Sequence, residues 1–127
     1  MRFCLGIESD RNAVQYARIN ASDQGITNCE FIDKSVEKVM KHPERFFKEK
    51  PDCAILDPTR AGCEEVVLAA LSKLAIARIV YVSCNPATLA RDLGYLVGNG
   101  YNIDKIQPFD FFPQTKHCEV VASLGLI

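Results

Sequence analysis

Short apolar runs alternate with helix-forming segments along almost the whole chain, and this alternation constrains the fold more than any other feature. Repeated strand–helix units are typical of an α/β domain, built on a mostly parallel sheet with helices on both faces. Strands are predicted at 3–7, 29–32, 53–56, 78–82, 101–106 and 120–124, and helices at 10–24, 36–40, 64–74 and 86–97.

The last two predicted strands are joined by QPFDFFPQTKHCE, a segment that is aromatic and irregular. Parallel neighbours require a long crossover connection, usually a helix, whereas antiparallel neighbours do not. These two strands are therefore expected to be antiparallel.

The length and charge of the chain limit the classes of function that it can have. The chain has 127 residues, which fits one domain, and its formal net charge is -1. A domain that binds nucleic acid alone is usually clearly basic, so charge gives no support for stand-alone RNA binding. No apolar run approaches the roughly 20 residues of a membrane span, so no membrane partner is expected. The start, MRFCLGIESD, is not typical of a signal peptide.

Six cysteines occur, and none form a C-x-x-C pair, so a metal site is not expected. Without a secretory signal a disulfide scaffold is not expected either, which favours a reducing, cytoplasmic location. The cysteines are Cys4, Cys29, Cys53, Cys63, Cys84 and Cys118.

Polar side chains follow several predicted strands directly. Glu8 follows the first, Asp33 and Ser35 the second, and Asp57, fixed by Pro58, the third. Open α/β sheets bind ligands at the carboxyl ends of their strands, and an acid after an early strand often holds a ribose. A solvated loop acid is the alternative interpretation of Glu8.

Cys84 lies where a β-branched strand becomes a helix, within VYVSCNPATLARD. Asn85 is a plausible N-cap and Pro86 fits the first helical position. The unpaired amides and the dipole of a helix N-terminus favour a thiolate, so Cys84 is a candidate nucleophile. A cysteine packed under the helix is the alternative. Glu119 begins the last strand, where a surface glutamate is the alternative to a functional one.

Four segments, GIESDRNAVQYARINA, LDPTRAG, IVYVSCNPATLARD and FPQTKHCE, resemble the RNA uracil carbon-5 methyltransferases, closest to the branch that modifies 23S ribosomal RNA. The resemblance implies a class I S-adenosylmethionine (SAM) methyltransferase fold and an RNA substrate. Cys84 matches the nucleophile that adds to uracil carbon 6, and Glu119 the base that removes the carbon-5 proton. Covalent addition divides a difficult step, and elimination then needs a positioned base.

The resemblance also implies cofactor contacts. Glu8 matches the acid on the SAM ribose, and Asp57 the acid beside the methionine end of SAM and the target base. Ser35 aligns with an adenine-side polar position, for which Asp33 competes. Arg60 is a candidate for contacting RNA or bracing its loop.

Relative to that family, the first strand of the methyltransferase fold and its glycine-rich loop are missing. Residues 1–127 are therefore expected to be the C-terminal part of a catalytic domain, an incomplete Rossmann-like fold, inactive as an isolated fragment. The missing strand belongs between the strands predicted at 3–7 and 53–56.

Other functions remain open at this point. One is a transfer RNA uracil-5 methyltransferase. Another is a receiver-like signalling domain phosphorylated at Asp57, although it leaves Cys84 and Glu119 unexplained. A nicotinamide dehydrogenase half-domain would also use Glu8, and an inert remnant could act as an interaction module.

Overall fold

The computed structural model describes residues 3–111, 114 and 117–127. Its chain divides into two compact units, unit 1 with residues 1–46 and unit 2 with residues 47–127. Among the described residues, no helix has both the length and the apolar character needed to cross a membrane.

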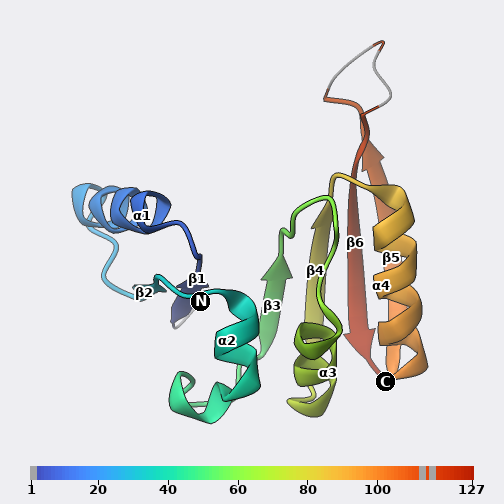
Figure 1. The fold of residues 1–127 in the computed structure, drawn as a ribbon, viewed down its shortest axis with the longest axis horizontal. Coiled ribbons are helices and arrows are strands. Elements are labelled where there is room, and N and C mark those ends of the chain that lie inside the picture. Colours follow the sequence, from blue (N-terminus) through green and yellow to red (C-terminus); the bar gives the residue numbers. More distant parts are fainter. Residues whose placement is uncertain (1–2, 112–113, 115–116) are drawn as a thin grey trace. The chain divides into compact units, whose positions relative to one another are not determined.

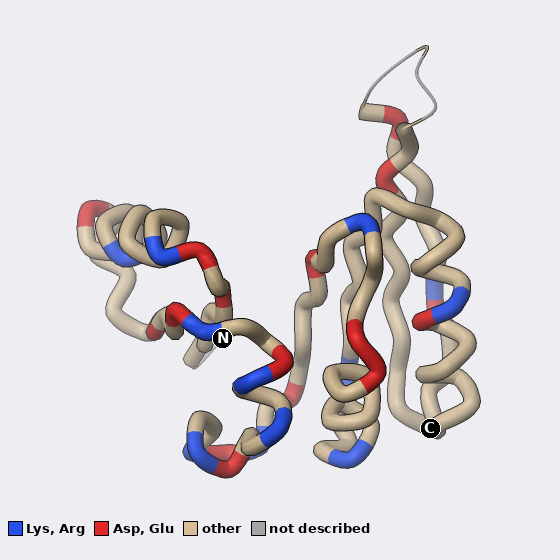
Figure 2. Tube along the Cα trace, in the orientation of Figure 1, with Lys and Arg blue, Asp and Glu red and all other residues tan. Residues whose placement is uncertain are grey.

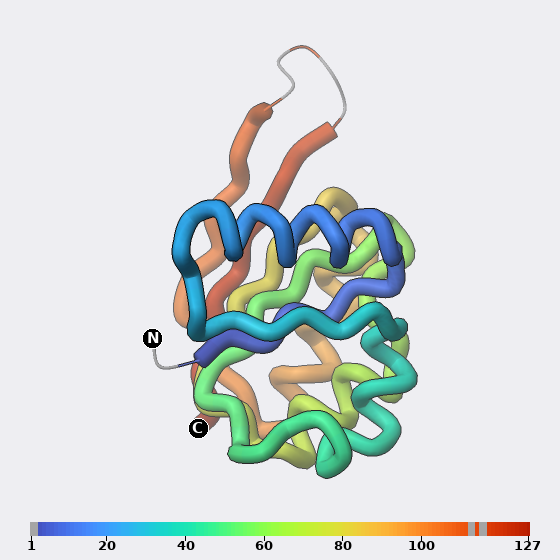
Figure 3. Tube along the Cα trace, turned by 90° about the vertical axis from the view of Figure 1, so that its left-hand side faces the viewer, coloured from blue at the N-terminus to red at the C-terminus, as the bar shows by residue number. Residues whose placement is uncertain are grey.

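Unit 1 is a two-stranded parallel sheet with its helices. Strand β1 (Cys4–Ile7) pairs with β2 (Cys29–Ile32) in a register that ends at Ile7 opposite Ile32. Helix α1 (Arg11–Asp23) joins the two strands and runs alongside them (Figures 1 and 3). Helix α2 (Val36–Lys41) and the short 3-10 helix η1 (Pro43–Arg45) complete the unit.

The ends of α1 follow from local chemistry. The side chain of Asp10 accepts hydrogen bonds from the amides of Asn12 and Ala13, at 2.9 and 3.3 Å. Asp10 is thus the N-cap of a helix that begins one residue later than predicted. After the helix, Gly25 has a φ of +67°, which only glycine adopts at no cost.

Unit 2 contains a four-stranded sheet in the order β3-β4-β6-β5, with helices α3 and α4 (Figure 1). The β3–β4 ladder is parallel, whereas the β4–β6 and β5–β6 ladders are antiparallel. The bounds are β3 (Cys53–Leu56), α3 (Glu65–Lys73), β4 (Arg78–Ser83), α4 (Pro86–Gly98), β5 (Tyr101–Phe109) and β6 (Glu119–Leu126).

The core of unit 2 lies between one face of this sheet and its helices. Alternate residues of β4 and β6 are buried, as expected when a strand has one covered face. Tyr101 is also buried, and its hydroxyl donates to the carbonyls of Leu71 and Ile76 at 3.2 and 2.8 Å. These bonds satisfy backbone acceptors at the end of α3. The alternating buried residues are Ile79, Tyr81 and Ser83 of β4 with Val120, Ala122 and Leu124 of β6.

The α/β class and the antiparallel pairing of the last two strands are confirmed, with one difference. Strand β6 inserts between β4 and β5, so the sheet is more mixed than the sequence predicted. Within unit 2, α3 and α4 contact each other and lie on one face of the sheet. Both crossovers advance in the same direction across the sheet, and right-handed connections then place both helices on the same side.

Both sheets have unpaired edges among the described residues: β1 and β2 in unit 1, and β3 and β5 in unit 2. The expectation that a further strand belongs between β1 and β3 stays a prediction.

Candidate active site

Cys84 and Glu119 occupy neighbouring positions at one end of the unit 2 sheet. β4 and β6 are antiparallel, and their last paired residues at this end are Ser83 and Val120. One step further, Cys84 leaves β4 and Glu119 begins β6. Both are partly exposed. The antiparallel register therefore brings together two residues that are 35 positions apart in the sequence.

The turn that carries Cys84 is held on both sides. The hydroxyl of Ser83 donates to the carbonyl of Asn85 at 2.9 Å and accepts from its amide at 3.0 Å. The Asn85 side chain accepts from the amide of Ala87 at 3.1 Å, which makes it the N-cap of α4 with Pro86 at the first helical turn. Both predictions for the start of this helix are confirmed.

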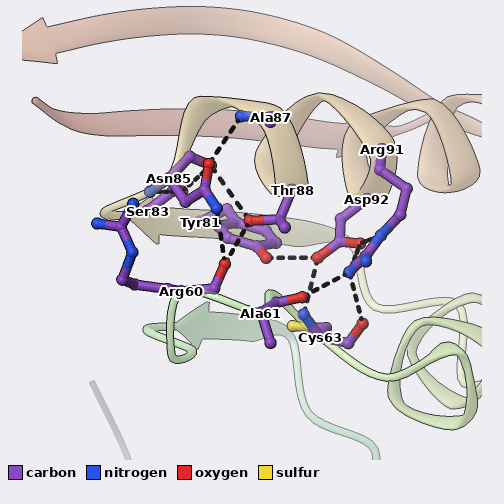
Figure 4. A network of polar contacts seen from close by, with 10 residues as sticks. All are labelled: Arg60, Ala61, Cys63, Tyr81, Ser83, Asn85, Ala87, Thr88, Arg91 and Asp92. Atoms are coloured by element: carbon purple, nitrogen blue, oxygen red, sulfur yellow. Dashed lines mark hydrogen bonds and ion pairs between the residues drawn. The ribbon is translucent and has the colours of Figure 1, made fainter.

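The loop after β3 brings Asp57 to the same end of the sheet. β3 is parallel to β4 and Leu56 pairs with Tyr81, so Asp57 and Cys84 both follow carboxyl ends of neighbouring strands. Asp57 is exposed. The carbonyl of Arg60 in this loop accepts from Asn85 Nδ2 at 3.0 Å and from Thr88 Oγ1 at 2.9 Å (Figure 4).

A second polar centre, around Asp92 of α4, was missed by the sequence analysis. Asp92 is 1% exposed, and its Oδ2 accepts from the Tyr81 hydroxyl at 2.5 Å and from the Cys63 amide at 2.8 Å. Its Oδ1 accepts from Nε and Nη2 of Arg91, each at 2.9 Å. Figure 4 shows these groups converging on one carboxylate.

The pKa values of the Asp92 partners reflect this contact. Burial, followed by the hydrogen bond to Asp92, raises the pKa of Tyr81 well above its ordinary value. The hydrogen bond to the Asp92 carboxylate, followed by its charge, also raises the pKa of Arg91. Tyr81 is therefore a neutral donor and Arg91 a cation at any physiological pH.

One sequence signal could have identified Asp92. The buried residues of α4 are Leu89, Asp92, Leu93 and Leu96, so the acid falls within the apolar stripe of an amphipathic helix. An aspartate is almost never fully buried unless it is paired, so this position predicts partners.

In unit 1, the strand-end acids lie next to each other. Ile7 pairs with Ile32, and Glu8 continues the pairing, since its amide donates to the carbonyl of Ile32 at 3.0 Å. Asp33 follows Ile32 directly. Glu8 Oε1 accepts from the amide of Asp10 at 2.8 Å, and Asp33 makes an exposed ion pair with Arg11 at 3.6 Å.

Ser35 has a structural role of its own. Its Oγ accepts from the amide of Lys38 at 3.3 Å, so it is the N-cap of α2. The hydroxyl keeps its own hydrogen for a second partner.

The predicted residues thus form two groups. Cys84, Asp57 and Glu119 lie at one end of the unit 2 sheet, and Glu8 and Ser35 follow the carboxyl ends of the unit 1 strands. The described residues contain no group of three or more His, Cys, Asp or Glu side chains that could hold a metal ion. Basic and acidic residues are interspersed within each unit (Figure 2), in line with the net charge of -1.

Comparison with solved structures assigns the fold. A Streptococcus thermophilus rRNA methylase superposes with a TM-score of 0.70 at 16% identity, covering 97% of this chain and 72% of that one. A Pyrococcus abyssi tRNA (uracil-54, C5)-methyltransferase, solved with S-adenosyl-L-homocysteine, gives a TM-score of 0.81 at 37% identity, covering 94% of this chain. The fold is the Rossmann-like one of class I SAM methyltransferases.

The family follows from the sequence comparison. The model of the tRNA (uracil-5-)-methyltransferase family matches residues 1–125, and the chain belongs to this family. Uncharacterized RNA methyltransferases of Gloeobacter violaceus and a Nostoc species are 46% and 47% identical over 97% and 99% of the chain. The chain spans about a quarter of their length, 26% and 27%.

Proposed function

We propose that this chain supplies the catalytic residues of an RNA methyltransferase that methylates carbon 5 of a uridine. The register of β4 and β6 carries the proposal, because it sets Cys84 and Glu119 at neighbouring positions beside the start of α4. Family membership supports the same reaction class.

Cys84 is the proposed nucleophile. Its thiolate adds to carbon 6 of a uracil that has left the base stack, and the new carbon–sulfur bond makes carbon 5 electron-rich. After carbon 5 has gained the methyl group, the Glu119 carboxylate removes the carbon-5 proton. The electron pair of that C–H bond reforms the ring double bond as the carbon–sulfur bond breaks, and the thiolate of Cys84 is released.

The cofactor is proposed to be S-adenosylmethionine, which supplies an electrophilic methyl group when bound. The acids of unit 1 fit a ribose, because Glu8 lies at a strand end and its Oε2 accepts no hydrogen bond within the described part of the chain. Ser35 is proposed to contact the adenine side. Asp57 is proposed to contact the methionine end and the target base.

Two RNA substrates are candidates. The sequence resemblance favours 23S ribosomal RNA. Transfer RNA is favoured by the Pyrococcus abyssi relative, a tRNA (uracil-54, C5)-methyltransferase that is 37% identical. The receiver-like alternative has lost its support, because receivers are doubly wound parallel folds and here β6 runs antiparallel between β4 and β5.

Glu8 and Ser35 belong to unit 1, whereas Asp57, Cys84 and Glu119 belong to unit 2, and the two sheets share no ladder in the described residues. We therefore propose that turnover needs more protein than residues 1–127. The additional protein can be supplied by a chimera, in which this chain replaces the matched segment of the Gloeobacter violaceus relative.

The test measures 5-methyluridine by nucleoside mass spectrometry after incubation of the chimera with S-adenosylmethionine and either 23S ribosomal RNA or transfer RNA. Methylation of one RNA, lost in Cys84→Ser, supports the proposal and identifies the substrate. If the parent relative methylates an RNA and the folded chimera methylates neither, the proposal is wrong.

A further inference from the structure

We propose that Asp92 is a positioning residue, which fixes the 57–63 loop relative to Cys84. The inference rests on the proposed function, because it concerns the loop that carries Asp57. Asp92 is 1% exposed and is not a group that could touch a substrate directly. Its effect on the reaction must pass through its partners.

Asp92 joins three separate elements. Its Oδ2 accepts from Tyr81 of β4 at 2.5 Å and from the backbone amide of Cys63 in the loop at 2.8 Å. Its own position is on α4, the helix whose start follows Cys84. The carboxylate therefore connects strand, helix and loop at one point.

Three further residues at and near the start of α4 bind the same loop. Asn85 and Thr88 bind the carbonyl of Arg60, and Arg91 Nη2 binds the carbonyls of Ala61 at 2.9 Å and Cys63 at 3.3 Å (Figure 4). All of these bonds reach the loop backbone, so they fix the path of the loop and not the identity of its side chains.

The fit between loop and helix is close at Gly62. This residue has a φ of +76°, and a Cβ built on it would lie 2.6 Å from Asp92 Oδ2 and 2.7 Å from Arg91 Nη2. Any side chain at this position would push the loop away from α4. Gly62 thus provides a second, independent way to displace the loop.

The chemistry of the junction requires a carboxylate. Every group that Asp92 contacts is a donor: a phenol, a backbone amide and a guanidinium. An asparagine would present an NH2 group to one of these donors, and that bond would be lost. Because a hydrogen bond to a charged group contributes more than a neutral one, the loop should loosen measurably.

Loosening the loop should slow the reaction without removing any reacting group. The loop begins at Asp57 and is fixed to the helix that starts beside Cys84, so its displacement changes the distance between these two residues. A misplacement of about 1 Å can cost roughly a hundredfold in rate.

The first arm of the test measures amide hydrogen exchange of residues 59–63 in the 127-residue chain. Asp92→Asn and Gly62→Ala should each accelerate exchange by about 10- to 100-fold. Tyr101→Phe is the matched control. It also removes a buried tyrosine hydroxyl from unit 2, but this hydroxyl donates to the carbonyls of Leu71 and Ile76 and not to the loop, so the loop should exchange at the wild-type rate. Unchanged exchange in Asp92→Asn and Gly62→Ala would overturn the inference.

The second arm measures kcat and RNA affinity in the chimera, at a temperature where all variants are folded. Asp92→Asn and Gly62→Ala should lower kcat by about a hundredfold while RNA affinity stays within about threefold, and Tyr101→Phe should keep kcat within about threefold. A purely structural role predicts that kcat follows thermal stability, with Tyr101→Phe as impaired as Asp92→Asn, and this result would overturn the inference. An inactive wild-type chimera would contradict the proposed function and not the role of Asp92. The hydrogen-exchange measurement would then test alone whether Asp92 fixes the loop.

Discussion

Ser83 pairs with Val120 across the antiparallel β4–β6 ladder, and this pairing determines where the two proposed catalytic residues lie. Cys84 and Glu119 are the next residues along the two strands, in opposite chain directions. A one-residue slip of the ladder would turn every β6 side chain to the opposite face. Their proximity is thus a property of the sheet register.

Replacement of the proposed base should trap an intermediate. Glu119→Gln cannot accept the carbon-5 proton, so in the chimera the methylated base should stay attached to Cys84 and turnover should fall by roughly 100-fold or more. A denaturing gel with labelled RNA detects the adduct. Asp104→Asn, an exposed acid on the neighbouring strand β5, is the control and should behave as wild type. Normal turnover by Glu119→Gln would contradict its role.

Ser35 and Asp33 can be distinguished by cofactor affinity. If the Ser35 hydroxyl contacts the adenine side, Ser35→Ala should weaken S-adenosyl-L-homocysteine binding to the chimera by about fivefold to tenfold, and Asp33→Asn should not. Ser35→Ala also removes the N-cap of α2, at a cost of about 1 kcal/mol. Calorimetric titration gives the affinity, and thermal unfolding gives the capping effect. The reverse order of the two variants would assign the contact to Asp33.

Tyr81 should make the chain less stable at alkaline pH. Its pKa is raised in the folded state by burial and then by the hydrogen bond to Asp92, whereas an unfolded tyrosine loses its proton near pH 10. Above pH ~10 the unfolded state therefore binds fewer protons, and the free energy of unfolding should fall by about 1.4 kcal/mol per pH unit for this group.

Urea unfolding between pH 8 and pH 11 measures this slope. Tyr81→Phe should have a shallower slope than wild type because it lacks the titrating group. Tyr101→Phe is a useful comparison, since burial also raises the pKa of Tyr101. Parallel curves for wild type and Tyr81→Phe would show that Tyr81 does not titrate as described.

The thiol of Cys4 should react slowly with alkylating reagents. It pairs with Cys29 across the β1–β2 ladder, and burial, followed by the neighbouring Cys29, raises its pKa. Less of it is thiolate at a given pH, so iodoacetamide at pH 8 should label the exposed Cys53 before Cys4. Peptide mass spectrometry over time gives the order. Cys29→Ser should accelerate the labelling of Cys4, and an unchanged rate would show that Cys29 has no influence.

Much of the fold could be predicted from local patterns. The predicted strands at 29–32 and 53–56 have the observed bounds, because each is a short, mostly apolar run with Asn or Asp directly before and after it. The strand order could not be predicted in this way. Nothing local to Glu119–Leu126 shows that β6 lies between β4 and β5, since that depends on pairing between distant segments.

In the candidate site, too, the features set by local interactions could be predicted and those set by distant residues could not. Asn85 and Pro86 marked the start of α4, because capping is a short-range interaction. Asp92 was missed, because its partners Tyr81 and Cys63 are 11 and 29 residues away. The buried position of an acid within an apolar helix stripe was the only local sign.

Covalent trapping tests the central claim most directly. The chimera is incubated with S-adenosylmethionine and RNA that contains 5-fluorouridine, in which fluorine replaces the proton that Glu119 would remove, so the bond to carbon 6 cannot break. The account predicts a protein–RNA adduct that maps to Cys84 by peptide mass spectrometry and is absent in Cys84→Ser. No adduct with either ribosomal or transfer RNA, while the parent relative is trapped, or an adduct at another cysteine such as Cys118, would contradict it.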